Sequence, residues 1–161
     1  MKSDKIKLKI GDILCFELNT ETFEFKKKYG FAKVLVKTKL GDAIDVYEYF
    51  SDDINDYKEA LKSKPLFDQP IILDGHSIFW KKIDCGKWIL LENEKGFEYN
   101  KKAKVKFKYG AKGFYKLIDL NNETFENLSQ KKIEEYPNYV PYGNYDVLSR
   151  IHFLLNARKG K

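Results

Sequence analysis

The sequence predicts a mainly β fold of the α+β class, arranged as a small curved antiparallel sheet or as a partly open SH3-like barrel. Two apolar runs rich in β-branched and aromatic residues, at 13–16 and 34–36, each follow closely after a glycine, Gly11 or Gly30. Such runs are typical of strands, and a glycine at a strand start permits a tight bend or a close backbone approach that a Cβ would block. Aromatic residues make up 16% of the chain, which also favours strands.

The length and composition predict one domain. The chain has 161 residues, of which 43% are hydrophobic, and this is enough to build a substantial core. We therefore expect a single domain that spans 1–161.

Polar turns divide the first half into strands. Lysine alternates with apolar residues at 6–10, which predicts a short edge strand, and acidic and apolar residues alternate between 44 and 49. The expected strands lie at 6–10, 12–18, 29–37 and 43–50.

A helix near residues 53–62 is expected next. Ser51, Asp52 and Asp53 supply capping oxygens and acidic groups that suit the positive end of a helix dipole, and Pro65 ends the segment. A short strand at 70–73 follows.

The second half predicts further strands and then helices. Strands are expected at 86–91 and 114–120, and a short helix after Ser129. Apolar residues then recur at helical spacing, which predicts a C-terminal helix near 145–157 that docks onto the sheet.

The formal net charge of +6 raises the alternative of a basic small-barrel nucleic-acid-binding protein, whose aromatic residues would stack on bases. However, only Arg150 and Arg158 are arginines among the 30 basic residues, and arginine dominates specific nucleic-acid contacts. The lysines at 5–10 and 102–108 alternate with apolar residues, which places them on the solvated faces of strands. We therefore favour a partner other than nucleic acid, and the basic nucleic-acid-binding protein stays the alternative.

The sequence also predicts a cytoplasmic protein with no membrane partner. No run approaches the roughly 18 apolar residues of a membrane span, and no apolar signal core follows the first residues. Cys15 and Cys85 are expected to be reduced thiols that behave as small hydrophobic residues.

Catalytic chemistry finds little support in the residues. His76 lies beside Asp74 and Ser77 in a predicted loop, but neighbours along a loop rarely converge as a catalytic relay, so a turn that bonds to itself is the favoured interpretation. His152 lies in the apolar C-terminal helix. With two histidines and no glycine-rich phosphate loop, we expect no catalytic residue, no metal, no cofactor and no enzymatic activity.

Four short motifs of structural glycines and strand hydrophobic residues lie at 9–13, 28–35, 65–67 and 86–88. Together they resemble the immunity protein 26 family of bacterial polymorphic toxin systems. The resemblance covers roughly residues 6–120 and leaves a helical C-terminal extension, 121–161, outside it. Ala32 stands where such families commonly have a glycine.

The resemblance implies a mainly β protein that binds a cognate toxin domain, encoded by the adjacent gene, and that neutralises it without catalysis. Aromatic anchors and a cluster of acidic residues would make the contact. The candidate toxin-binding residues are the aromatic residues Tyr29, Trp80, Tyr139 and Tyr142 and the acidic residues Asp45, Glu48, Asp52 and Asp53.

Overall fold

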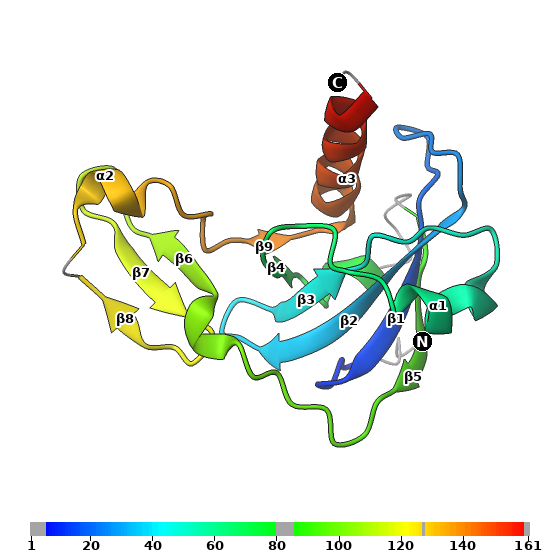
Figure 1. Ribbon diagram of the computed structural model, residues 1–161, viewed down its shortest axis with the longest axis horizontal. Helices are drawn as coiled ribbons and strands as arrows, with labels where there is room; N and C mark the ends of the chain where they lie inside the picture. The colour runs from blue at the N-terminus through cyan, green and yellow to red at the C-terminus, as the bar shows by residue number, and fades with distance from the viewer. Residues whose placement is uncertain (1–5, 80–85, 127, 160–161) are drawn as a thin grey trace, which may run out of the picture.

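Two β-sheets carry the fold of the computed structural model, which describes residues 6–79, 86–126 and 128–159 (Figure 1). Six strands form the larger sheet in the order β5-β1-β2-β3-β4-β9, and three form the smaller sheet in the order β6-β7-β8. The larger sheet contains β1 (Asp12–Glu17), β2 (Tyr29–Lys37), β3 (Asp42–Val46), β4 (Ile71–Leu73), β5 (Trp88–Asn93) and β9 (Pro141–Tyr142). The smaller sheet contains β6 (Lys106–Tyr109), β7 (Lys116–Asp119) and β8 (Thr124–Phe125). The α-helices are α1 (Tyr57–Ala60), α2 (Gln130–Ile133) and α3 (Asn144–Lys159).

The predicted mainly β, α+β class is confirmed. The larger sheet is open, since its strand order runs from one edge to the other and no closed barrel is formed among the residues that the structure describes. Its neighbouring strands are antiparallel except for β4 and β9, which pair in parallel with Ile72 opposite Pro141. This parallel pair brings the chain back to the sheet edge immediately before α3 begins (Figure 1).

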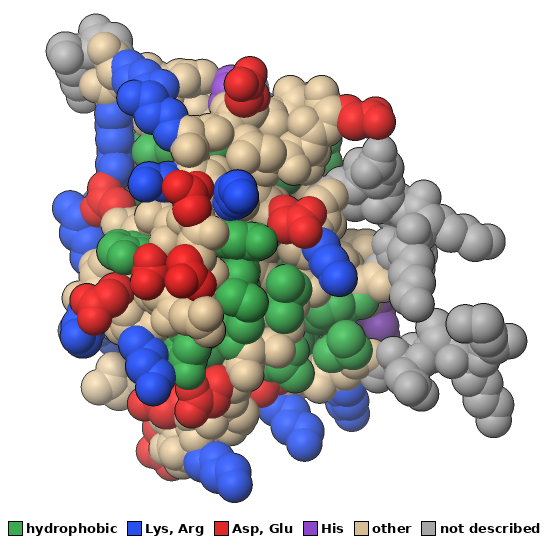
Figure 2. Space-filling view, turned by 90° about the vertical axis from the view of Figure 1, so that its right-hand side faces the viewer, with side chains coloured by type: hydrophobic (Ala, Val, Ile, Leu, Met, Phe, Trp, Pro, Cys, Tyr) green, Lys and Arg blue, Asp and Glu red, His purple; other side chains and the backbone are tan. Residues whose placement is uncertain are grey.

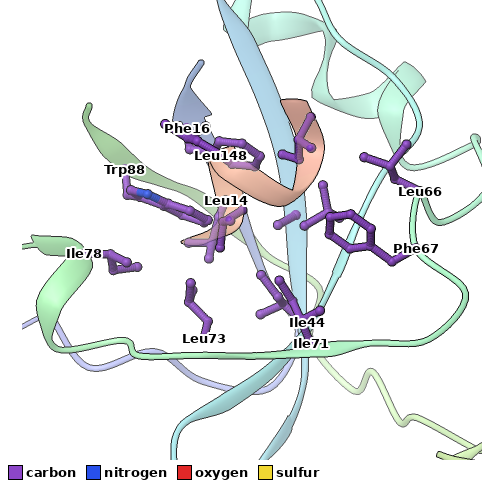
Figure 3. Close-up of a cluster of buried hydrophobic side chains, with 14 of the residues drawn as sticks. Leu14, Phe16, Ile44, Leu66, Phe67, Ile71, Leu73, Ile78, Trp88 and Leu148 are labelled. Atoms are coloured by element: carbon purple, nitrogen blue, oxygen red, sulfur yellow. The ribbon is translucent and has the colours of Figure 1, made fainter. Parts of the chain in front are cut away.

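One face of the larger sheet is buried beneath α3. Side chains from alternate strand positions, such as Leu14, Val34 and Ile44, pack with Val147 and Leu148 of the helix. Alternation follows from the pleat, which sends successive side chains to opposite faces. Figure 3 shows this cluster, with Trp88 and Phe16 on one side of the helix and Leu66 and Phe67 on the other.

The opposite face of the same sheet is covered in two places. Near α1, Cys15, Phe31 and Tyr47 pack against Ala60. At the other end, strand residues including Leu35 pack against the smaller sheet. Burial on both faces explains why β2 is nearly continuous in apolar residues.

The indole of Trp88 joins the sheet to the start of α3. Its ring stacks on Phe16 with 4.5 Å between the ring centroids, and its Nε1–H donates to Oδ1 of Asn144 at 2.6 Å. Both Trp88 and Asn144 are buried. A buried indole N–H requires an acceptor, and Asn144 supplies it from the first turn of the helix.

The glycines predicted to allow close backbone approach do so. Gly11 has a φ of +88°, and a Cβ placed on it would lie 2.6 Å from the carbonyl oxygen of Glu94. A Cβ on Gly30 would lie 2.5 Å from Cζ of Phe16. These two positions therefore require glycine for different reasons. At Gly11 both the positive φ and the lack of space for a Cβ exclude other residues, whereas at Gly30 only the lack of space does so.

The prediction of a strand at 6–10 is wrong. Leu8 turns into the core, and the backbone N–H of Lys9 donates to Oδ2 of Asp12 at 2.7 Å, so this segment forms a turn. The lysine alternation there reflects one buried leucine in a loop and not a strand.

Two other predicted strands are shorter than expected. The strand predicted at 43–50 ends at Val46, whose carbonyl accepts from the N–H of Leu66 at 2.7 Å in the loop that follows α1. The strand predicted at 114–120 begins only at Lys116, because Phe114 lies in a turn and is 80% exposed.

The helix predicted near 53–62 has the right place but only one α-helical turn. Asp53 caps a 3₁₀ turn at Ile54–Asp56 by accepting from the N–H of Asn55 at 2.9 Å, and α1 follows directly. After α1 the helical turn ends, and the hydroxyl of Ser63 donates to the carbonyl of Ala60. The C-terminal helix is confirmed and extends slightly beyond the predicted 145–157 at both ends.

Replacing Gly11 by alanine should destabilise the fold more than the same change at Gly96. Both glycines have a positive φ, but the space around a Cβ at Gly96 is empty. We expect Gly96→Ala to cost about 1 kcal/mol and Gly11→Ala about 2 to 4 kcal/mol, because only Gly11→Ala adds a clash with backbone. Equal free energies of unfolding for the two variants in denaturant titrations would contradict this account.

Candidate functional site

Glu48 is held by two cations of the same chain. Its carboxylate pairs with Lys64 at 3.2 Å and with Arg158 near the end of α3. Burial alone would raise the pKa of Glu48, but the hydrogen bonds and charges of Arg158 and Lys64 together lower it. The residue therefore fastens the last turn of α3 to the loop after β3.

Asp52 and Asp53 are exposed at the start of the 3₁₀ turn before α1. Oδ1 of Asp52 accepts from the backbone N–H of Lys28 at 3.2 Å, and its carboxylate lies 3.7 Å from Nζ of Lys27. Tyr29 lies beside them, because its backbone pairs with Ser51. The structure thus brings Tyr29, Asp52 and Asp53 together.

Asp45 lies on the opposite side of β3 from α3, in register with Lys33 of β2. Lys33 is buried, and its ammonium contacts Glu94 and the ring of Phe97, 3.8 Å from the centroid. Burial raises the pKa of Asp45 to about 6, although the charges of Lys101 and Lys33 oppose the rise. This carboxylate belongs to the sheet and has a different set of partners from Glu48 and Asp52.

Two of the predicted aromatic anchors are packed largely within the protein, and one lies outside the described residues. Tyr139 is half-buried, with its ring centroid 5.8 Å from that of Phe107. The hydroxyl of Tyr142 accepts from Arg150 at 3.0 Å. Trp80 falls in the 80–85 segment that the structure does not describe.

The turn that contains His76 bonds to itself. Oδ1 of Asp74 accepts from the backbone N–H groups of His76 and Ser77, and the hydroxyl of Ser77 donates to the carbonyl of Asp74. Asp74 thus acts as a turn-forming side chain. Over the described ranges, moreover, His, Cys, Asp and Glu form no cluster that could hold a metal ion.

Sequence reasoning missed a groove of about 630 Å³ between α3 and the segment that follows β1. Its lining residues are Leu18, Glu24, Phe25, Lys26, Lys27, Phe50, His152, Leu155, Asn156 and Lys159. The side of the molecule that lies at the right in Figure 1 also carries hydrophobic side chains in the middle of its face, with charged side chains around them (Figure 2). The available signal was Leu155, which extends the apolar stripe of α3 beyond its buried residues.

Comparison with known proteins identifies a family match for this chain. Residues 9–113 match the sequence model of a family described as Immunity protein 26, which is more than half of the chain. The chain belongs to the immunity protein 26 family. No curated protein matches the chain, and no solved structure matches it either.

The immunity protein 26 match confirms the resemblance predicted for roughly 6–120, over a slightly shorter range. The matched region runs from before β1 into the turn after β6, so α3 lies outside it. One wall of the groove therefore belongs to the family region and the other to the C-terminal extension. Within the part of the chain that is described, no helix is both long and apolar enough to cross a membrane.

Replacing Asp45 by asparagine should stabilise the protein at neutral pH. Because the pKa of Asp45 is higher in the folded state than its ordinary value of 3.8, the folded state binds the proton more tightly, and stability falls as the pH rises from about 4 to 6. The amide that replaces the carboxylate would carry no charge, so Asp45→Asn should raise the free energy of unfolding by about 1 to 3 kcal/mol at pH 7.5 and by little at pH 4.

Denaturant titrations at the two pH values measure this difference. Asp68→Asn, a change at an exposed aspartate, is the matched control and should show no comparable gain. A gain for Asp45→Asn that is the same at both pH values would show that its carboxylate is not the cause.

Replacing Glu48 by glutamine should loosen the end of α3. The change keeps the side-chain size but removes the charge that holds Arg158 and Lys64. We expect amide hydrogen exchange at 156–159 to become several-fold faster with little change at Leu148, since helix ends open locally. Glu59→Gln, which breaks the ion pair with Lys62 elsewhere, should leave exchange in α3 unchanged.

Proposed function

We propose that this chain neutralises a cognate bacterial polymorphic toxin by direct protein–protein binding, as a cytoplasmic immunity protein without enzymatic activity of its own. The match of residues 9–113 to the immunity protein 26 family carries the proposal. The toxin domain would be the product of the adjacent gene. The whole chain, 1–161, would act as one binding unit, with the C-terminal extension as part of its surface.

The packing of the larger sheet supports a binding role. Both faces of the sheet are covered by buried clusters, so the outer surface is held in place before any partner arrives. A surface that needs little ordering on association loses less free energy when it binds. This property favours tight binding of a partner.

Exposed residues near α1 offer one contact region. Asp52 and Asp53 are exposed and lie beside half-buried Tyr29, so a partner can reach all three. A tyrosine flanked by carboxylates combines an anchor with charges that speed association. Asp45, Glu48, Tyr139 and Tyr142 remain candidate contacts of lower accessibility, since each already engages or packs against groups of this chain.

Co-expression with the adjacent gene tests the proposal. If that gene encodes a toxin domain, we expect this chain to restore growth of cells that produce the toxin and to co-purify with it as a stable complex. Isothermal titration with the two purified proteins should give a dissociation constant in the nanomolar range or below. A toxin that kills equally well with and without this chain, and that does not bind it, would refute the proposal.

A further inference from the structure

We infer that the groove between α3 and residues 24–27 receives an apolar side chain of the toxin that is flanked by acidic residues. This inference rests on the proposed function and names the chemistry of the contact. It differs from the sequence expectation, in which acidic residues of this chain would face a cationic toxin.

The floor of the groove is apolar, and the groove is large enough to receive apolar side chains of a partner. Leu18, Phe25, Phe50 and Leu155 contribute to a volume of about 630 Å³. His152 lines it too, with its ring centroid 5.7 Å from that of Phe25 in an edge-on arrangement. A concave apolar site of this kind is what an aromatic or aliphatic anchor fills at a protein interface.

The charged residues that line the groove are mostly basic. Lys26, Lys27 and Lys159 stand against a single acid, Glu24. Lys27 pairs with Asp52, whereas neither Lys26 nor Lys159 takes part in an ion pair within the described residues. Lysines around an apolar site attract carboxylates of a partner and raise the association rate.

Two of the candidate acidic residues, Glu48 and Asp45, are less suited to a cationic partner. Glu48 is matched by Lys64 and Arg158, and Asp45 is partly buried near Lys33. The charge that remains available around the groove is therefore positive, and it complements an acidic surface.

Internal contacts keep the groove open before binding. Ile151, one turn before Leu155, is fully buried against the sheet. The ion pair between Glu48 and Arg158 fastens the far end of the same helix. The α3 wall of the groove is thus fixed independently of any partner.

A nucleic acid fits this site less well than a protein. Both arginines are engaged within the chain, because Arg158 pairs with Glu48 and Arg150 lies 4.7 Å from the ring centroid of Phe67. The rings of Phe25 and His152 pack on each other. Single strands are usually bound by bidentate contacts to phosphate and by stacking of bases on free aromatic faces. The arginines and the paired rings of Phe25 and His152 are not available for these contacts.

Charge reversal around the groove tests the inference once a toxin complex is in hand. Lys26→Glu combined with Lys159→Glu should weaken toxin binding by at least about tenfold in isothermal titration, since both changes place like charges against the acidic partner. Lys39→Glu combined with Lys112→Glu, which makes the same charge change at two exposed lysines elsewhere, should weaken it less than about twofold.

A change in the apolar floor gives a second, independent measurement. Leu155→Asp should weaken toxin binding by at least about tenfold while the circular dichroism of the free variant stays that of the folded wild type, since Leu155 is half-buried at the edge of the core. Unchanged affinity in both the double variant and Leu155→Asp would overturn the inference and leave the proposed function standing.

Peptide probes separate the two proposals if no toxin binds. A labelled hexapeptide Asp-Glu-Leu-Phe-Glu-Asp should shift the amide resonances of His152 and Leu155 and should bind more tightly than its counterpart Lys-Lys-Leu-Phe-Lys-Lys. Shifts caused by the acidic peptide without any toxin complex would support the groove chemistry and refute the proposed function. Equal binding of the two peptides, or shifts caused only by a short oligothymidine, would overturn the groove assignment.

Discussion

The contact between Trp88, Phe16 and Asn144 determines where the C-terminal helix lies. The indole stacks on a phenyl ring from the central strand β1 and donates its N–H to the first residue of α3. Because the stack is buried, the ring cannot shift without opening the core. The start of α3 is thereby fixed to the sheet, and the position of Leu155 three turns further along follows from the helix geometry.

The distribution of charge follows a consistent pattern. Glu48 is satisfied within the chain by Lys64 and Arg158, whereas several exposed lysines take part in no ion pair among the described residues. Even the buried ammonium of Lys33 has a carboxylate and an aromatic face beside it. Burying such a charge requires this compensation, because desolvation alone would be costly. The excess of basic side chains that gives the net charge of +6 therefore lies at the surface and not in the core.

Sequence reasoning captured the features that depend on local physics. The strand at 29–37 was predicted to the residue, because a long apolar run after Gly30 has few alternatives. The C-terminal helix was found from its apolar spacing. The prediction of a strand at 6–10 failed because the alternation there coincides with a turn in which Asp12 accepts from the N–H of Lys9, a local side-chain hydrogen bond that apolar periodicity does not encode.

The candidate site was harder to predict than the fold. The groove joins Phe25 with Leu155, which are far apart in the sequence, and no local pattern links them. The pairing of Glu48 with Arg158 was equally hard to predict, since the two residues are 110 positions apart in the sequence. Because α3 stands outside residues 9–113, recombination that exchanges the end of the gene would replace one wall of the groove and spare the other. Under the proposed function, such an exchange would change which partner the groove accepts while the sheet stays the same.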